Sequence, residues 1–238
     1  MRGNVISVSP SVLLAGDSTV ANYAAVERPM SGWGEHLGTH LNALLGPSAS
    51  GGGVTVANFA KGGANTSSHR GEGLWDALLR AAHPGDLVLI QFGHNDAKLP
   101  SLAARGGYRE NLAHMVQDCR DHGLRPVLCT PVGRRTLVDG VYAGSHGDYP
   151  VVVRELAESL GVALIDVEAL SAGVYEAYGD EGSVRLFMHF TPGEHHLWRD
   201  GVRDDTHFSL LGASEVARAV AGELRPLVES AQAEGEGR

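Results

Sequence analysis

The chain has 238 residues, of which 43% are hydrophobic, 20% charged and 6% aromatic, a composition that excludes collagen, coiled coils and wholesale disorder. Its 19 basic and 28 acidic residues give a formal net charge of −9, which argues against nucleic acid or an anionic membrane surface as a partner. No linker interrupts the pattern of elements along the chain. We therefore expect a single domain over residues 1–238, with a frayed tail at about 231–238.

The amino-terminal sequence MRGNVISVSPSVLLAG contains one Arg and a short apolar run broken by Ser and Pro. Because it lacks the long apolar region of a signal peptide, we expect no signal peptide and a cytoplasmic location. No apolar stretch approaches the roughly 20 residues that cross a bilayer, so we expect no membrane partner. The two cysteines, Cys119 and Cys129, are too few for a disulfide framework and are expected to be free thiols.

Short apolar runs of strand length alternate along the chain with stretches of helical periodicity. The predicted strands are rich in Val, Leu and Ile and cover residues 12–15, 54–58, 87–92, 126–130 and 162–166. The predicted helices cover residues 34–45, 74–82, 108–122, 151–160 and 209–228. Strands with so few polar interruptions are typical of sheets that are covered on both faces. The alternation therefore predicts the α/β class, as a three-layer α/β/α sandwich with a five-stranded parallel sheet.

Two of the predicted helices carry a clear apolar face. In the helix over 108–122, the apolar side chains at i, i+3, i+4 and i+7 are Leu112, Met115, Val116 and Cys119. The last helix presents a longer stripe made of Leu210, Ala213, Val216, Ala217, Val220, Ala221 and Leu224. Ser209 stands before this helix and is suited to cap it. The stretch 46–53, rich in Gly and Ser, is expected to be a loop.

Ligands of parallel α/β sheets bind beyond the carboxyl ends of the strands, and the first predicted strand ends there in Gly16-Asp17-Ser18-Thr19. Ser18 is a candidate nucleophile, although the same residue types are common in turns and helix caps. A serine nucleophile needs an imidazole base and a carboxylate that orients it. Asp204 and His207 offer both within three residues. The alternative interpretation of this segment is a solvated acidic turn.

Two further strand ends carry groups that suit an oxyanion hole, a set of donors for the negative oxygen of a tetrahedral intermediate. Asn95 follows the strand at 87–92 and is a candidate side-chain donor. Gly62 and Gly63 follow the strand at 54–58, and either could present a backbone amide. Asn and Gly are also ordinary turn residues, so each of these signals is weak by itself.

Several other chemistries have no motif in the sequence. The G-x-S-x-G elbow of α/β-hydrolases, the P-loop, the dinucleotide-binding glycine pattern and H-E-x-x-H do not occur. His195 and His196 are adjacent, and neighbouring side chains on an extended chain point to opposite sides. They are a poor pair of metal ligands, and we expect neither a metal nor a cofactor.

The order of these motifs resembles the four blocks of the SGNH hydrolases, also called GDSL esterases. More narrowly, the sequence is similar to the rhamnogalacturonan acetylesterase branch, carbohydrate esterase family twelve. The resemblance runs over about residues 12–224. It is carried by the segments LAGDSTVA, SGWGEHL, VANFAKGGANTSS, EGLW, GDLVLIQFGHNDAK, TPVGRR, FMHFTPGEHHLW and DDTHFSLLGASEVA.

The resemblance implies a flavodoxin-like sheet and a serine esterase that removes O-acetyl groups from carbohydrate, with pectic oligosaccharides of rhamnogalacturonan type as the expected substrate. It implies Ser18 as nucleophile, His207 as base and Asp204 as the carboxylate that orients the base. The oxyanion donors would be the amides of Ser18 and Gly63 and the side chain of Asn95. No cofactor is implied.

The substrate-binding residues are less clearly marked. In the family, Arg-Ser usually follows the oxyanion glycine, whereas Ala64 and Asn65 follow it here. This departure bears on substrate identity. The candidates for contacts to the sugar are Trp198 and His196, and those for contacts to a uronate carboxylate are Arg134 and Arg135. The alternatives are that Trp198 only packs beneath a loop and that the arginines are solvated.

Two other functions remain open on the sequence. One is an SGNH esterase, thioesterase or acyltransferase with a non-pectic substrate, such as acetylated xylan or a lipid. The low aromatic content and the lack of an apolar lid disfavour a long acyl chain. The other is a carbohydrate-binding protein without turnover, which would be expected to lack a member of the triad or of the oxyanion hole. The expected partner is an acetylated oligosaccharide or another small ester, and no oligomeric state is predicted.

Overall fold

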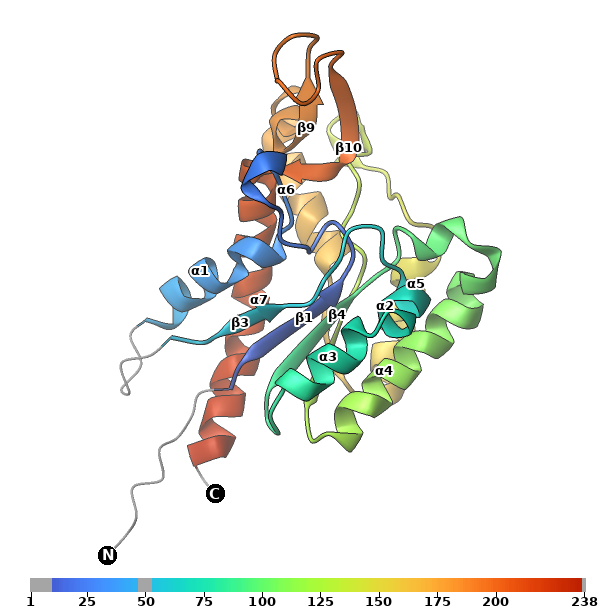
Figure 1. The fold of residues 1–238 in the computed structure, drawn as a ribbon, viewed down its shortest axis with the longest axis vertical. Coiled ribbons are helices and arrows are strands. Elements are labelled where there is room, and N and C mark those ends of the chain that lie inside the picture. Colours follow the sequence, from blue (N-terminus) through green and yellow to red (C-terminus); the bar gives the residue numbers. More distant parts are fainter. Residues whose placement is uncertain (1–9, 47–52, 237–238) are drawn as a thin grey trace, which may run out of the picture.

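The computed structural model describes residues 10–46 and 53–236. Its centre is a parallel sheet of five strands, β1 (Val12–Gly16), β3 (Val56–Asn58), β4 (Leu87–Gln91), β5 (Arg125–Cys129) and β8 (Ala163–Ile165). The strands lie in the order β3-β1-β4-β5-β8, which is the order of the flavodoxin-like sheets. Figure 1 labels β3, β1 and β4 of this sheet. The predicted parallel sheet is confirmed, and each strand overlaps the apolar run that predicted it.

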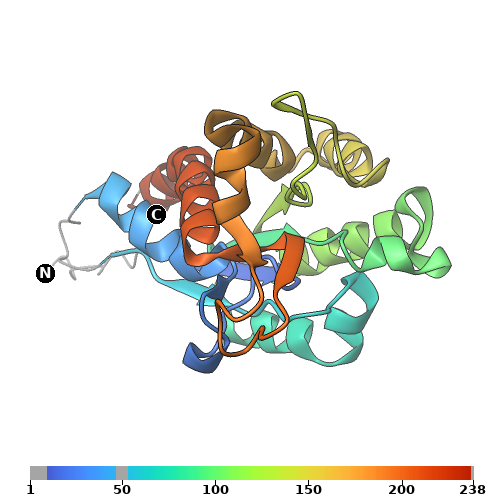
Figure 2. The ribbon, with the colours of Figure 1, turned by 90° about the horizontal axis from the view of Figure 1, so that it is seen from above.

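Helices cover both faces of this sheet. One face packs against α1 (Gly34–Leu45), α6 (Val167–Gly182) and α7 (Leu210–Glu236). The other packs against α2 (Thr66–Gly71), α3 (Leu74–Ala81), α4 (Arg109–Asp121) and α5 (Tyr149–Leu160). Figure 2 shows α7 and α3 on opposite sides of the sheet. Alternate residues of β1 enter the two cores, because side chains on a strand point alternately to its two faces. The predicted three-layer sandwich is therefore confirmed.

The predicted apolar stripe of α4 is buried in full, and both cysteines are buried free thiols. The stripe of α7 is buried except for Leu210, which is 41% exposed. Ser209 caps this helix as predicted, because its Oγ accepts the Gly212 N–H at 3.3 Å. The helix continues through Glu236, past the residue 231 at which a frayed tail is expected, and Ala231 is only 6% exposed. Residues 47–52 of the expected loop lie outside the described residues.

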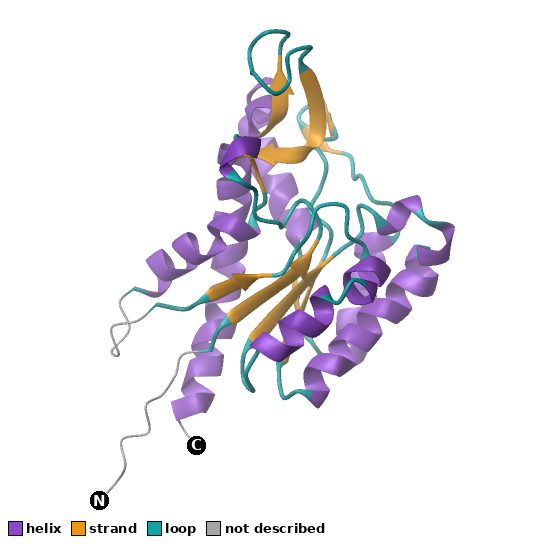
Figure 3. Cartoon of the chain, in the orientation of Figure 1, coloured by secondary structure: helices purple, strands orange, loops and turns teal. Residues whose placement is uncertain are grey.

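A second, antiparallel sheet stands beyond the carboxyl ends of the parallel strands (Figure 3). It consists of β2 (Met30–Ser31), β9 (Phe187–Phe190) and β10 (Val202–Ser209), with β10 in the middle. A short hairpin of β6 (Leu137–Val138) and β7 (Val141–Tyr142) lies elsewhere. The sequence analysis predicted neither this sheet nor α6. The segment around Asp204, for which a solvated turn was the alternative interpretation, lies in strand β10, and this decides the geometry of the site.

The remaining elements are single turns. They are η1 (Ala25–Glu27), η2 (Asp96–Lys98), η3 (Pro100–Leu102), the π-helical turn η4 (Ala104–Tyr108) and η5 (Ser183–Leu186). Two of them flank residues that matter below. The turn η2 begins directly after Asn95, and η5 joins α6 to β9.

Candidate active site

Ser18 lies in a tight turn directly after β1. The carboxylate Oδ1 of Asp17 accepts the backbone N–H of Thr19 at 2.9 Å and its hydroxyl at 2.7 Å, which is the self-contained bonding that Asp provides at turns. Val20 and Ala21 donate their N–H groups to the Asp17 carbonyl. Ser18 itself is only 9% exposed. The turn is thus fixed by its own sequence and holds the hydroxyl at the edge of the sheet.

A chain of buried hydrogen bonds supports the turn from the neighbouring strand. Gln91, the last residue of β4, donates from Nε2 to Thr19 Oγ1 at 2.8 Å. Its Oε1 accepts the indole N–H of Trp33 at 2.9 Å. The sequence analysis missed this role, although a Gln at the end of an otherwise apolar strand was the available signal.

His207 connects Ser18 to Asp204. Its Nε2 is 3.0 Å from Ser18 Oγ, and its Nδ1 is 2.7 Å from Asp204 Oδ2. Ser18 and His207 are 189 positions apart in the chain, and the fold brings them within hydrogen-bond distance. The three side chains form a hydroxyl–imidazole–carboxylate series, which is the arrangement that a serine nucleophile and its base require.

A bulge in β10 makes this arrangement possible. Side chains three positions apart on a regular strand point to opposite faces. Asp204 pairs with Met188 of β9, but the next pair joins Phe208 to Phe187, so residues 205–207 are extra on β10. The other carboxylate oxygen of Asp204, Oδ1, accepts the N–H groups of residues 206 and 207 at 2.8 and 3.0 Å. The bulge turns the imidazole to the same side as the carboxylate.

These bonds also set the charge of Asp204. Burial raises its pKa, but hydrogen bonds from the His207 imidazole and from the amides of His207 and Thr206 outweigh burial and bring the pKa to about 2. The carboxylate is therefore ionised at neutral pH and can only accept hydrogen bonds. The proton of a neutral His207 must then be on Nδ1, which leaves Nε2 free to accept the hydroxyl of Ser18.

The series opens into a cavity of about 430 Å³. The cavity is lined by Ser18, Tyr23, Gly62, Gly63, His94, Asn95, Lys98, Arg134, Asp204, Thr206 and His207. All the residues predicted as the triad and the oxyanion hole therefore share one cavity.

The predicted oxyanion residues are held by short-range contacts. The Nδ2 group of Asn95 donates to the Ala64 carbonyl at 2.9 Å, and its Oδ1 accepts Lys98 Nζ at 2.8 Å. The lysine fixes which end of the amide is the donor, and one N–H of Nδ2 remains for a ligand. Gly62 and Gly63 occupy the middle of a turn closed by the N–H of Ala64 on the carbonyl of residue 61 at 3.1 Å.

Gly62 and Gly63 differ in backbone conformation. Gly63 has a φ of +78°, whereas Gly62 is outside the left-handed region. A side chain at either position would meet no atom within 4 Å. The left-handed conformation explains why residue 63 is Gly. The assignment of Gly63 rather than Gly62 as amide donor stays a prediction.

The four predicted substrate contacts lie in three places. Arg134 lines the cavity, and its buried Nε has no hydrogen-bond partner among the described residues. Arg135 lines a different cavity. Trp198 and His196 lie on the loop between β9 and β10 and do not line the Ser18 cavity. The Trp198 ring stacks on Phe190, with the ring centroids 5.6 Å apart.

The sequence analysis predicted no role for four residues that line the cavity, Tyr23, His94, Lys98 and Thr206. The hydroxyl of Tyr23 donates to the Ser18 carbonyl at 3.0 Å. Burial and then the charge of Asp17 raise the pKa of Tyr23, so the phenol stays neutral. His94 is 3% exposed, and its Nδ1 is 3.3 Å from Asp17 Oδ2. Its ring contacts that of His146, whose pKa burial lowers to about 3.

Two general properties of the chain complete the description. Within residues 10–46 and 53–236, no three His, Cys, Asp or Glu side chains are grouped so that they could hold a metal ion. Over the same ranges, no helix combines the length and the apolar character that a membrane crossing requires.

Comparisons with known proteins identify the family of the chain. Residues 14–214 match the sequence model of the GDSL-like Lipase/Acylhydrolase family. The chain is 41% identical over 217 residues to the rhamnogalacturonan acetylesterase RhgT of Bacillus subtilis, covering 91% of this chain and 90% of that protein. It is 31% identical over 227 residues to the probable rhamnogalacturonan acetylesterase YesY of the same organism, covering 92% and 96%.

Solved structures agree with the fold. The crystal structure of the protein YxiM from Bacillus subtilis superposes with a TM-score of 0.75 at 26% identity, over 92% of this chain and 57% of that one. A catalytic mutant of Axe2, an acetylxylan esterase from Geobacillus stearothermophilus, superposes with a TM-score of 0.61 at 19% identity, over 92% and 96%, and shares the fold. With its parallel sheet, its serine turn and this match over most of its length, the chain belongs to the GDSL-like Lipase/Acylhydrolase family.

Proposed function

We propose that this chain is a serine acetylesterase that removes O-acetyl groups from pectic oligosaccharides of rhamnogalacturonan type. The observation that carries the proposal is the continuous contact from Ser18 Oγ through His207 to Asp204, at 3.0 and 2.7 Å, inside a cavity that also contains oxyanion donors. The names of the relatives RhgT and YesY support the substrate class.

The proposed reaction has two acyl-transfer steps. Ser18 Oγ attacks the ester carbonyl as its proton passes to His207 Nε2, and Asp204 stabilises the imidazolium that forms. The negative oxygen of the tetrahedral intermediate accepts hydrogen bonds from the amides of Ser18 and Gly63 and from Asn95 Nδ2. The bond to the sugar oxygen then breaks, and His207 returns the proton to that oxygen. The acetyl group stays on Ser18.

Water completes the cycle. His207 Nε2 takes a proton from the water as it attacks the acetyl-enzyme, and the same proton returns to Ser18 Oγ when acetate leaves. Every proton and leaving group in this scheme is handled by residues of the chain, and the scheme uses no cofactor.

The charge of the cavity favours an acidic sugar. Arg134 and Lys98 bring two cationic groups to its lining, and Asp204 is its one acidic side chain. The guanidinium of Arg134 is a suitable donor for a carboxylate that enters the cavity. Because the chain as a whole has a net charge of −9, attraction for a uronate has to come from such a local cluster. This supports a pectic oligosaccharide over neutral xylan.

The decisive experiment measures acetate release from acetylated rhamnogalacturonan and acetylated xylan oligosaccharides, with Ser18→Ala as the control. We expect faster release from the pectic substrate and none with Ser18→Ala. Faster release from xylan would contradict the substrate, and activity retained in Ser18→Ala would contradict the mechanism. Sugar binding without any turnover would instead support a carbohydrate-binding protein.

A series of p-nitrophenyl esters tests the lipid alternative. We expect the rate to be highest with acetate and to fall as the acyl chain lengthens. A maximum at a long acyl chain would assign the site to a lipid ester.

A further inference from the structure

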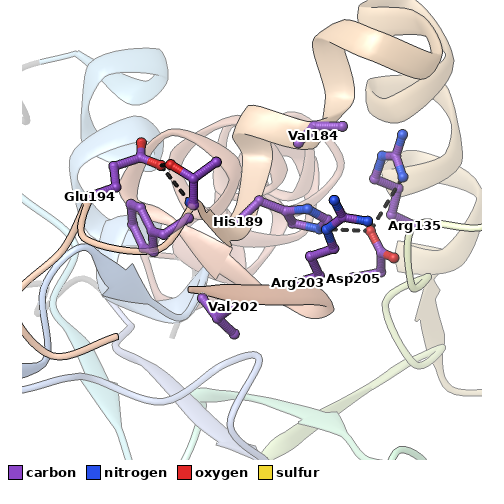
Figure 4. A pocket seen from close by; sticks show the side chains of 9 residues that line it. Arg135, Val184, His189, Glu194, Val202, Arg203 and Asp205 are labelled. Atoms are coloured by element: carbon purple, nitrogen blue, oxygen red, sulfur yellow. Dashed lines mark hydrogen bonds and ion pairs between the residues drawn. The ribbon is translucent and has the colours of Figure 1, made fainter. Parts of the chain in front are cut away.

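A group of charged side chains lies on the far side of the bulge that carries the proposed base. Asp205 is the neighbour of Asp204, but it lines a second cavity of about 530 Å³ that shares no residue with the Ser18 cavity. Figure 4 shows Asp205 in this second cavity together with Arg135 and His189. The bulge thus sends its side chains in two directions, one toward the proposed chemistry and one away from it.

Asp205 is bonded through both its side chain and its backbone. Its Oδ1 lies 3.3 Å from a terminal nitrogen of Arg135 and 3.0 Å from His189 Nε2. Its carbonyl accepts the backbone N–H of Arg135 at 2.8 Å. His189 lies on β9 and Arg135 on the loop after β5. The bulge is therefore joined to two other parts of the fold at a single residue.

Arg135 in turn is anchored to a third segment. Its Nε donates to Ser183 Oγ at 2.9 Å, and its second terminal nitrogen donates to the carbonyl of Asp180. Both partners lie at the junction of α6 and η5. The guanidinium is thus engaged with the protein, and its side chain is 19% exposed. This arrangement differs from the substrate contact that the sequence analysis predicted for Arg135.

The bulge needs such support because the sheet does not provide it. Between the pairs Asp204–Met188 and Phe208–Phe187, β9 offers no register partner to residues 205–207. On its inner side, the bulge is held by the amide bonds to the Asp204 carboxylate. On its outer side, the Arg135–Asp205 contacts take the place of the missing ladder.

We propose that Arg135 and Asp205 are positioning residues that hold the β10 bulge in register with β1, so that His207 Nε2 meets Ser18 Oγ. Asp204 adjoins the bulge and His207 lies in it, whereas Ser18 lies in the turn after β1 of the parallel sheet. A displacement of the bulge therefore changes the distance between base and nucleophile without separating the base from its carboxylate. The inference rests on the proposed function and adds to it the residues that set this distance.

The test compares Arg135→Met with Arg203→Met. Arg203 lies on β10 and lines the same cavity, is exposed, and has no ion pair among the described residues, so its replacement removes the same charge. The backbone bond from residue 135 to residue 205 does not depend on the side chain, which favours a folded variant. The rates are measured with p-nitrophenyl acetate, which has no carboxylate for an arginine to bind.

We expect Arg135→Met to lower kcat by about ten- to a hundredfold, the range that small misplacements of reacting groups produce, with KM nearly unchanged. Arg203→Met is expected to match the parent protein. Asp205→Ala should reproduce the loss. Asp205→Asn should lose less, because both bonds end on Oδ1 and an amide oxygen there can still accept them, although the charge is lost.

A spectroscopic readout separates positioning from support of the fold. The downfield proton resonance of the His207–Asp204 hydrogen bond should persist in Arg135→Met, because these two residues move together. The pH profile of kcat/KM should change, because the contact between Ser18 and His207 is altered. A lower thermal midpoint with kcat equal to that of Arg203→Met would overturn the proposal and leave only a structural role. Activity in Ser18→Ala would instead overturn the proposed function, so the two failures are distinguishable.

Discussion

Asp204 and His207 lie three residues apart on one strand, and the carboxylate Oδ2 of Asp204 is 2.7 Å from the imidazole Nδ1 of His207. Two backbone amides of the same bulge occupy the other carboxylate oxygen. The Asp204 carboxylate is therefore held in place by the same segment that carries His207. The following predictions start from this pair and extend to the groups around it.

Replacing Asp204 with Asn should abolish most of the activity at neutral pH. The amide can present its N–H to Nδ1, which places the imidazole proton on Nε2, where it cannot accept the hydroxyl of Ser18. By analogy with serine hydrolases in general, we expect kcat to fall by about 10²- to 10⁴-fold. Initial rates with p-nitrophenyl acetate measure the effect, and Asp200→Asn, an exposed replacement on the neighbouring loop, is the control. Equal rates for the two variants would contradict the assignment.

The stability contributed by Asp204 should disappear in acid. Its folded-state pKa is lowered from the ordinary value of 3.8 to about 2, so ionisation of this carboxyl group stabilises the fold. The contribution is full above the unfolded pKa near 4 and is lost as the pH falls toward 2. The difference in thermal midpoint between the parent protein and Asp204→Asn should therefore shrink across this window. A difference that stays constant from pH 5 to pH 2 would contradict the pKa.

Ala should be tolerated at position 62 and costly at position 63. Neither Cβ would meet an atom within 4 Å, but Gly63 has a φ of +78°. A left-handed Ala costs about 1–2 kcal/mol, and relief of that strain would move the amide proposed to bind the oxyanion. We expect Gly63→Ala to lower both the unfolding free energy, measured in urea, and kcat. A larger loss of kcat in Gly62→Ala would assign the oxyanion amide to residue 62.

Removing the amide of Gln91 should destabilise the protein. Gln91→Leu keeps the size of the side chain but leaves the buried indole N–H of Trp33 without an acceptor and removes a donor to Thr19. An unsatisfied buried group costs about 1–3 kcal/mol. Gln117→Leu removes a hydrogen bond of an exposed glutamine on α4 and should change the stability by no more than about 0.5 kcal/mol. Similar urea midpoints for the two variants would contradict a supporting role of Gln91.

The central sheet could be predicted because its residues are almost uniformly apolar. Helix α1 matches its predicted range, Gly34–Leu45, to the residue. Helix α6 was missed because Gly173 and Gly179 dilute its pattern, and Gly179 has a φ of +69° inside it. The predicted end of α7, at residue 228, is too early. The sequence beyond it has no apolar periodicity, so the burial of Ala231 could not be predicted.

Strand β10 could not be predicted from periodicity. It is mostly polar, with Phe208 as its single fully buried residue, and its bulge breaks the alternation on which strand prediction depends. The motif around Asp204 was recognisable because its spacing is local. Its position opposite Ser18 depends on contacts across the whole chain.

Neighbouring arginines illustrate the limit for single residues. Arg134 and Arg135 were indistinguishable in sequence, yet one lines the Ser18 cavity and the other lines the cavity behind β10. The path of the loop after β5 determines which cavity each arginine lines. Gln91 is the opposite case. It was visible in the sequence as the single polar side chain of an apolar run, but no structural role was predicted for it.

The division of the proposed catalytic groups between two sheets affects how the protein should respond to heat. Ser18 is attached to the large parallel sheet, whereas its base is attached to a small three-stranded sheet. That sheet joins the hydrophobic core through Phe187 and Phe208, but polar contacts hold its bulge. The bulge can therefore open locally at lower cost than the whole molecule unfolds. Loss of turnover during warming should then run ahead of the loss of helical circular dichroism, and enzymatic rate would serve as a gauge of that local opening.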